Sequence, residues 1–251
     1  MKYYGILVVY NMDVSESVSY QFINRHKEIN LIVVDNSDHD FKNNKKVESD
    51  GNTYLSMNGN QGLSRAYNTA LDWIQKYNPE MDGYVILLDD DTSLNEEYLN
   101  EVKKVSCDIA VPVVKAKNII ISPCRIKRDI VSQWDGQSNL LDFSAINSGM
   151  VISLHLFKNY RYDEKLFLDY VDHQFMKDMK MRDIQIMNAQ LNQSFSGMEV
   201  SNQNGDQKRF QLFKADSQCF YKGSPASYLY VVGKRKLRLA IKYRNPLLLF
   251  M

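Results

Sequence analysis

The sequence has few cysteines and lacks any long apolar run. Its three cysteines, Cys107, Cys124 and Cys219, are scattered and odd in number, which argues against a disulfide framework and indicates a reducing compartment. No stretch is long and apolar enough to span a membrane, and the first residues enter a strand pattern without an apolar leader. We therefore expect a cytoplasmic protein that lacks a signal peptide.

Several sequence signatures of phosphate, metal and nucleophile chemistry are also missing. The chain contains neither G-x-x-x-x-G-K-[ST] nor G-x-G-x-x-G, so the P-loop and dinucleotide-binding classes lack their glycines. It has no G-x-S-x-G nucleophile elbow and no Cys/His spacing typical of zinc. The histidines are isolated, and each is interpreted as solvated or structural. They are His26, His39, His155 and His173.

The net charge of +1 conceals an uneven distribution. Residues 217–251 carry seven Lys or Arg and no acid, so this segment is formally +7 and the first 216 residues are −6. An acidic body argues against nucleic acid as a partner. Residues 225–251 are predicted to form a basic amphipathic segment that makes peripheral contact with the anionic inner face of the cell membrane. A C-terminal helix packed on the sheet, with solvated cations, is the alternative.

Apolar runs of strand length alternate with helical patterns in the first part of the chain. The expected strands are residues 6–10, 31–35, 53–56 and 84–89, and the expected helices are residues 14–26 and 63–77. Because strands that alternate with helices form parallel sheets, we predict an α/β fold. After residue 105 we expect short strands of mixed direction at 109–114, 119–123, 141–143 and 149–154, then a helix at 172–182 and a polar loop at 200–208.

Polar or aromatic side chains follow three of these strands at the point where each strand ends. They are Tyr10, Asp35 and the triplet Asp89-Asp90-Asp91. Ligands of open α/β sheets gather at the carboxyl ends of strands, and three adjacent acids are tolerated when a hard divalent cation lies among them. A ring, a hydrogen-bonding acid and a cation site suit a nucleoside diphosphate. The alternatives are a packed aromatic residue and acids that only cap turns or helices.

Five short motifs follow one another between about residue 4 and about residue 197. They are Val8–Asn11, Val33–Ser37, Asn58–Asn68, Leu87–Thr92, and Asn147–Gly149 followed by Tyr162–Asp172. In order and spacing they resemble the inverting nucleotide-sugar glycosyltransferases of family 2, and most of all the rhamnosyltransferase-like branch that builds bacterial surface polysaccharides. The resemblance implies the GT-A fold of nucleotide-diphospho-sugar transferases, a Rossmann-like mixed sheet flanked by helices.

The resemblance also implies a division of the chain. A GT-A domain would comprise residues 1–224, with a nucleotide-binding half at 1–105 and an acceptor and catalytic half at 106–224. The basic segment 225–251 would follow it.

Donor-binding roles follow from the positions of residues within these motifs. The resemblance implies that Tyr10 and Asp35 hold the base of the donor nucleotide. It implies that Gly62 lets the backbone approach the nucleotide, and that Arg65 or Asn68 fixes this loop. We expect all five side chains or backbones to contribute to donor binding.

The acidic triplet matches the D-x-D motif of the same family. Asp89 would lie toward the ribose and Asp91 toward the metal, so both are candidate ligands of a divalent cation, Mg²⁺ or Mn²⁺. Asp90 would orient or cap the donor-binding loop. Many relatives carry a metal-holding histidine in a later L-x-H-x-x-G-like stretch, whereas this chain has Gln193 there. The difference favours Mg²⁺ and weak binding.

Asp172 lies where the family places its catalytic base, and Asp169 is its nearest competitor. Inverting transfer needs a base that takes the proton of the acceptor hydroxyl while the oxygen attacks the anomeric carbon, opposite the leaving diphosphate. The alternative for Asp172 is an acid at a helix start that interacts with the helix dipole.

The predicted function is transfer of a sugar from a nucleoside-diphosphate donor to a saccharide or lipid-linked acceptor. The branch suggests rhamnose carried by deoxythymidine diphosphate. A catalytically degenerate nucleotide-sugar-binding protein of the same fold is one alternative. A D-x-D phosphatase-like hydrolase is another, but that class places its acids after the first strand and has Thr or Val where this chain has Ser93. The oligomeric state stays open.

Overall fold

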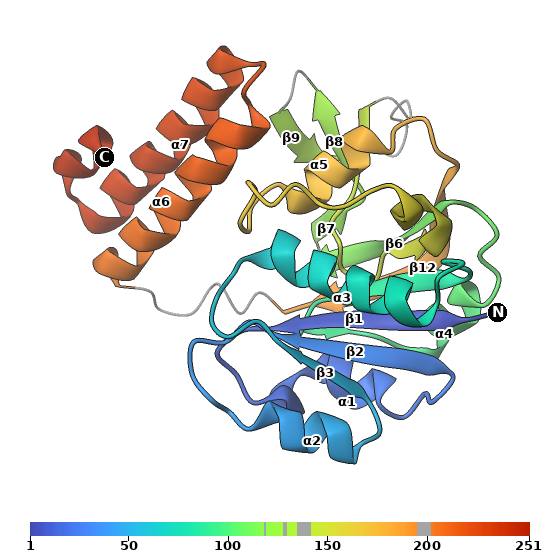
Figure 1. Ribbon diagram of the computed structural model, residues 1–251. Coiled ribbons are helices and arrows are strands. Elements are labelled where there is room, and N and C mark those ends of the chain that lie inside the picture. Colours follow the sequence, from blue (N-terminus) through green and yellow to red (C-terminus); the bar gives the residue numbers. More distant parts are fainter. Residues whose placement is uncertain (118, 128–129, 135–141, 195–201) are drawn as a thin grey trace.

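The computed structural model describes residues 1–117, 119–127, 130–134, 142–194 and 202–251 (Figure 1). In these residues the main sheet has nine strands, in the order β3-β2-β1-β4-β11-β6-β12-β5, and β7 pairs with β6 outside this path. The first four strands in sequence are β1 (Tyr3–Val9), β2 (Ile29–Asp35), β3 (Thr53–Ser56) and β4 (Tyr84–Leu88). All of their mutual pairings are parallel, as the alternation of strands and helices predicts.

The second half of the sheet is mixed. Its strands are β5 (Thr92–Ser93), β6 (Ile109–Ala116), β7 (Ile119–Ser122), β11 (Val151–Ser153) and β12 (Ile184–Gln193). Strand β11 runs antiparallel to β4 and β6, and β12 runs parallel to β6 but antiparallel to β5. A smaller antiparallel sheet contains β8 (Cys124–Lys127), β9 (Ile130–Gln133) and β10 (Phe143–Ser144).

Helices cover both faces of the main sheet (Figure 1). They are α1 (Val18–Ile23), α2 (Asn43–Ser49), α3 (Leu63–Tyr77), α4 (Glu96–Val102) and α5 (Val171–Asp178), with the short 3₁₀ helices η1 (Val14–Glu16) and η3 (Leu154–Lys158). The predicted apolar face of α3 is buried against one face of the sheet with α5, and α1 and α4 pack on the other. Each fully buried Leu or Ile contributes roughly 1.5–3 kcal/mol.

The helix expected over residues 14–26 is divided in two. Asp13 accepts a hydrogen bond from the backbone N–H of Ser15 and caps η1, and Ser17 accepts one from Tyr20 and caps α1. Two N-caps within five residues start two short helices because each cap satisfies N–H groups that a continuous helix would have bonded internally.

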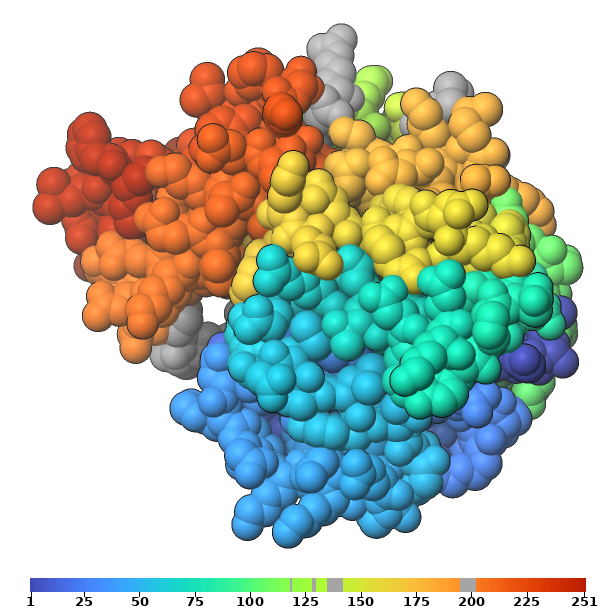
Figure 2. All heavy atoms as spheres, in the orientation of Figure 1, coloured from blue at the N-terminus to red at the C-terminus, as the bar shows by residue number. Residues whose placement is uncertain are grey.

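The prediction of a loop at residues 200–208 is wrong for the described residues, since α6 (Gln203–Phe220) begins there. Asn202 caps it by accepting from the N–H of Gly205, and Asp206 lies in its first turn. Residues 200 and 201 lie outside the described residues. Helix α6 packs with α7 (Pro225–Tyr243) and η5 (Pro246–Phe250) around a small core of its own, so the pair forms a lobe at the side of the body (Figure 2).

The α/β class and the mixed, helix-flanked sheet of a GT-A fold are therefore confirmed. The basic segment is helical, and it packs on α6, while Tyr228 and Val231 also pack against the main core. In the described residues no helix is both long and apolar enough to cross a lipid bilayer.

Candidate active site

A cavity of about 510 Å³ opens at the carboxyl ends of β1 and β4. Strand ends supply Tyr10 and Asp89, the turn before α3 supplies Gly62, and α6 supplies Lys208 and Arg209. Because parallel strands end at one edge of the sheet, side chains far apart in sequence meet here. The predicted triplet and Tyr10 are thus brought together, and two cations that the sequence analysis missed are added.

Tyr10 and Asp35 lie in adjoining hollows. The ring of Tyr10 is 49% exposed at the main cavity, and its hydroxyl donates to Asp38 at 2.9 Å. Asp35 and Asp38 line a second hollow of about 470 Å³ at the ends of β2 and β3. The buried carboxylate of Asp35 accepts from Asn43 at 2.9 Å and from the Tyr54 hydroxyl at 3.1 Å. Its contact with a nucleotide base stays a prediction.

The backbone of the turn at Gly62 lies very close to the backbone of Phe167. Gly62 has φ +88°, and a Cβ there would lie 2.8 Å from the carbonyl oxygen of Phe167. The adjacent Leu63 N–H donates to that same oxygen at 2.6 Å. A glycine is therefore required here, because the backbone is left-handed and because a Cβ would collide with the Phe167 carbonyl oxygen. The turn joins the donor side of the cavity to the segment that precedes Asp172.

Arg65 and Asn68 do not line the main cavity. Arg65 forms an ion pair with Glu164 at 3.2 Å. Asn68 donates to the carbonyl of Tyr162 at 3.0 Å and accepts from its N–H at 2.9 Å. Both side chains therefore fix the segment around residues 162–164 from behind, and a direct contact with the donor stays a prediction.

Asp89 is the electrostatic centre of the acidic triplet. Burial raises its pKa to about 6, and the neighbouring carboxylates of Asp91, Asp90 and Asp172 also raise it, while a hydrogen bond from Ser148 opposes them. Burial likewise raises the pKa of Asp90, and the charge of Asp91 raises it further. The cluster thus resists holding all of its negative charges at once.

Strand β12 brings Gln193 to this cluster. Gln193 pairs with Thr92 across β5, and its side-chain amide donates to Asp89 at 3.2 Å and to Asp91 at 2.9 Å. Turning the amide by 180° would present its oxygen to the same two carboxylates. In the described residues no group of three or more His, Cys, Asp or Glu could hold a metal ion. Two carboxylates and an amide oxygen fit a weakly held hard cation whose remaining ligands are phosphate oxygens and water.

Asp172 and Asp169 have different surroundings. Asp172 lies in the first turn of α5, 20% exposed, and accepts from the His173 N–H at 2.7 Å. Asp169 instead forms a two-pronged ion pair with Arg209, one arm of which measures 2.8 Å. Both carboxylate oxygens of Asp169 are therefore engaged by the guanidinium. The geometry therefore favours Asp172 over Asp169 as a base.

Helix α6 holds the segment that leads to Asp172. The buried Asp216 accepts from the backbone N–H groups of Phe167, Leu168 and Asp169 at 2.7, 2.8 and 2.7 Å. Nothing in the local sequence around Asp216 identifies this role, because the bonds connect residues about fifty positions apart. A charged side chain thus stabilises a tight turn beside the cavity.

Residues 13–174 match the family model described as Glycosyl transferase family 2. No curated protein matches the sequence significantly. Among solved structures the chain is similar to 4-diphosphocytidyl-2C-methyl-D-erythritol synthase, with 11% identity, a TM-score of 0.48, and 84% of this chain and 98% of that chain covered.

A second similar structure is a protein assigned as a nucleotide-diphospho-sugar transferase from Desulfovibrio desulfuricans G20. It has 10% identity and a TM-score of 0.40, and the match covers 88% of this chain and 97% of that chain. These structural likenesses are distant and say nothing of a substrate.

Proposed function

The chain belongs to glycosyl transferase family 2 and is a nucleotide-sugar glycosyltransferase, and we propose that it transfers its sugar with inversion at the anomeric carbon. One observation carries the proposal. Residues 144–148 link the two acids, since Ser148 donates to Asp89 and the Ser144 hydroxyl lies 2.8 Å from Nδ1 of His173, the neighbour of Asp172. In the proposal, Asp172 and the site of the leaving group act on one sugar from two sides.

In the proposed reaction Asp172 takes the proton of the acceptor hydroxyl. The acceptor oxygen forms a bond to the anomeric carbon as the bond from that carbon to the diphosphate oxygen breaks, and the nucleoside diphosphate leaves. Lys208 and Arg209 line the cavity from α6 and would face the negative charge that grows on the diphosphate. Tyr10 would stack on the base, with Asp35 and Asp38 as acceptors from base or ribose.

Asp89, Asp91 and Gln193 would hold a divalent cation beside the diphosphate. Such an ion, Mg²⁺ or Mn²⁺, supplies positive charge to the departing diphosphate oxygens. The raised pKa of Asp89 supports this assignment, because a cation removes the repulsion among the acids.

Replacing Asp91 by Ala is expected to remove most of the metal-dependent donor binding. The carboxylate lies 2.9 Å from the Gln193 amide at the site of the proposed ion. Because the ion has few protein ligands, the loss of one strongly weakens its binding. Isothermal titration of the nucleoside diphosphate with and without Mg²⁺ measures the effect. The exposed Asp82 provides a control, Asp82→Ala. Equal Mg²⁺ dependence in wild type and Asp91→Ala would remove Asp91 from the site.

A panel of nucleotide sugars tests the function as a whole. We expect one nucleoside diphosphate, with deoxythymidine diphosphate as the first choice, to raise the melting temperature in Mg²⁺ or Mn²⁺ but not in EDTA. The matching sugar nucleotide, with rhamnose tested first, should be turned over with a saccharide or lipid-linked acceptor of a bacterial surface polysaccharide. Binding without turnover would favour a degenerate nucleotide-sugar-binding protein. Stabilisation by no nucleotide at all would defeat the proposal.

We also propose that α7 contacts an anionic membrane surface. Lys234, Leu237, Arg238 and Ile241 have the i, i+3, i+4, i+7 spacing of one helix face. Leu237 and Ile241 are 52% and 69% exposed there, and η5 adds further exposed apolar side chains. Cations interleaved with exposed apolar residues suit the interface of an anionic bilayer.

Replacing Leu237 and Ile241 by Glu should abolish co-flotation with phosphatidylglycerol vesicles, because the apolar contact is lost and two like charges are added. A matched variant, Tyr77→Glu with Met181→Glu, changes two apolar residues outside α7 that are somewhat more exposed, and it should float as wild type does. Unchanged flotation of the α7 variant would contradict the membrane contact.

A further inference from the structure

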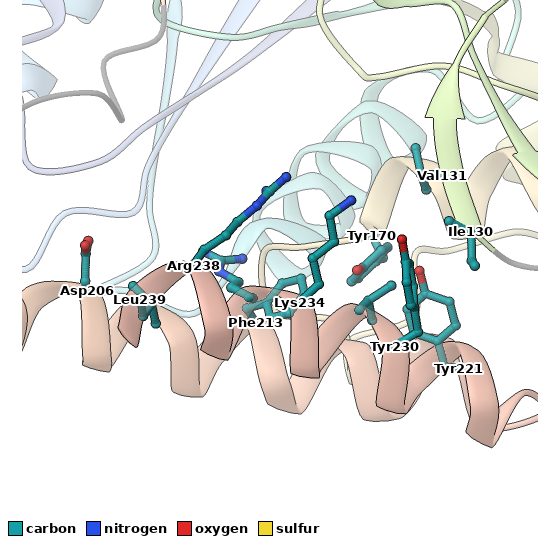
Figure 3. A pocket seen from close by; sticks show the side chains of 12 residues that line it. Ile130, Val131, Tyr170, Asp206, Phe213, Tyr221, Tyr230, Lys234, Arg238 and Leu239 are labelled. Atoms are coloured by element: carbon teal, nitrogen blue, oxygen red, sulfur yellow. The ribbon is translucent and has the colours of Figure 1, made fainter. Parts of the chain in front are cut away.

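A second cavity of about 460 Å³ lies between the α6–α7 pair and β9. Lys234 and Arg238 extend into it from α7, and the rings of Tyr170, Tyr221 and Tyr230 lie around them (Figure 3). This space, called the α7 groove below, is distinct from the donor cavity in its lining residues. A ligand bound in the α7 groove would therefore differ from the nucleotide of the donor cavity.

The α7 groove has an excess of positive charge. In the parts of the chain that the structure describes, no ion pair joins Lys234, Arg235 or Arg238 to a carboxylate. Arg235 lies over the ring of Phe213 at 4.1 Å. Burial and then the guanidinium of Arg209 lower its pKa, while the charges of Asp169, Tyr170 and Asp206 oppose this effect. The groove thus gathers three cations, Lys234, Arg235 and Arg238, with which an anion would interact favourably.

The carboxylate that lines the groove offsets these cations only in part, since its charge, with that of Asp169, raises the pKa of Arg235. Asp206 accepts from the Lys242 ammonium at 2.7 Å and from the Tyr243 hydroxyl at 2.7 Å. Its charge is therefore held by a lysine that does not line the groove. Three cations and several tyrosine rings remain, and this combination recognises a phosphate group next to a flat apolar or sugar surface.

The groove and the donor cavity lie on two sides of the same chain segment. Phe167 and Leu168 line the donor cavity, and Tyr170 lines the groove. Helix α6 contributes to both, through Lys208 and Arg209 on one side and Phe213 and Tyr221 nearby on the other. Asp172 follows this segment at the start of α5. Tyr170, which lines the groove, caps α5, and the proposed base Asp172 lies two residues further on in the first turn of that helix.

We propose that the α7 groove binds the phosphate or diphosphate group of the acceptor, whose sugar hydroxyl then reaches Asp172. The assignment rests on the proposed glycosyltransferase function and specifies the acceptor as a phosphate ester of a saccharide. Lys234 and Arg238 bind the phosphate oxygens, and the tyrosines contact the adjoining sugar. The exposed Leu237 and Ile241 on the same helix face leave room for a lipid attached to that phosphate.

Isothermal titration with inorganic diphosphate and with glucose 1-phosphate tests this assignment. Three variants are compared with wild type. Lys234→Ala with Arg238→Ala removes two of the three cations of the groove. Lys222→Ala with Lys236→Ala removes two cations that do not line it, and Lys208→Ala alters the donor cavity alone. Circular dichroism and melting temperature confirm that each variant folds.

We expect the groove variant to bind both phosphate compounds roughly tenfold or more weakly, while the control pair binds as wild type does. Glucose without phosphate should not bind. Equal binding by the groove variant and wild type would overturn the proposal, as would a loss confined to Lys208→Ala, which would assign the anion to the donor cavity.

Vesicles distinguish an acceptor phosphate from a lipid headgroup surface. Binding to phosphatidylglycerol but not phosphatidylcholine vesicles, without binding of either soluble phosphate compound, would overturn the assignment in favour of a membrane surface. A failure of the proposed glycosyltransferase function would appear separately, as the absence of stabilisation by any nucleotide in the panel above.

Discussion

Replacing Asp172 by Asn is expected to lower the rate of sugar transfer by roughly 10²–10⁴-fold, the range that general-base catalysis contributes. The amide keeps the size of the side chain and can still accept from the His173 N–H, but it cannot take up a proton. Donor binding should remain, because the donor cavity is lined by other residues. The measurements are kcat with a competent acceptor and the melting-temperature rise with nucleoside diphosphate.

Two further variants make this result specific. Asp178→Asn changes an exposed carboxylate at the far end of the same helix and should transfer at the wild-type rate. Asp169→Asn weakens the ion pair with Arg209, so we expect it to lower stability and to affect transfer less than Asp172→Asn. Normal turnover by Asp172→Asn, together with loss in Asp169→Asn, would move the base to Asp169.

The strand ends were predictable because one physical pattern determines both the strand and its end. Apolar runs such as Tyr84–Leu88 favour buried strands, and the acids that follow them mark the strand ends because a buried carboxylate needs hydrogen-bond partners or a counter-ion. Parallel pairing then brings Tyr10, Asp35 and Asp89 to one edge of the sheet. What the pattern could not give was the partner of each side chain, since Asp35 is held by Asn43 and Tyr54 through tertiary contacts.

Helix α6 was missed because its first two turns lack an apolar stripe. Residues Gln203–Arg209 are polar or Gly, and the first fully buried side chain is Phe210. Packing against α7 therefore stabilises the helix more than local propensity does. The cost of this error was functional as well as structural, because Lys208, Arg209 and Asp216 all lie on α6.

Strand β12 carried a signal that could have been used. Met187, Ala189 and Leu191 are buried and alternate with exposed polar residues, which is the period of a half-buried strand. Extending that alternation places Gln193 at the end of the strand, beside the triplet. The resemblance implies that this amide stands near the position of a metal-holding histidine, but its contact with both Asp89 and Asp91 depends on the antiparallel pairing with β5.

The second large effect concerns Asp89, whose replacement by Asn should stabilise the protein while abolishing its activity. Burial raises the pKa of Asp89 to about 6 from its ordinary value of 3.8. The folded state therefore holds this proton more tightly than the unfolded state, and the free energy of unfolding falls as the pH rises from about 4 to about 6. Above that range the ionised carboxylate costs roughly 1–3 kcal/mol in the absence of a cation.

Asparagine removes this cost and keeps an oxygen that accepts from Ser148 and Gln193. At pH 7.5 in EDTA the Asp89→Asn variant should melt several degrees higher than wild type, since about 1 kcal/mol shifts the melting temperature of a chain of this size by roughly 2–4 °C. The difference should shrink toward zero near pH 4. Asp82→Asn, at an exposed site, should show neither change.

The pH dependence separates electrostatic cost from packing. A gain that persists unchanged at pH 4 would come from better packing of the amide, and no gain at pH 7.5 would mean that Ser148 and Gln193 already offset the buried charge. If the gain follows the predicted window, adding Mg²⁺ and nucleoside diphosphate should reverse the order of the two melting temperatures, because only the carboxylate binds the ion. A buried acid that destabilises the free protein is then retained because it becomes favourable when the donor is bound.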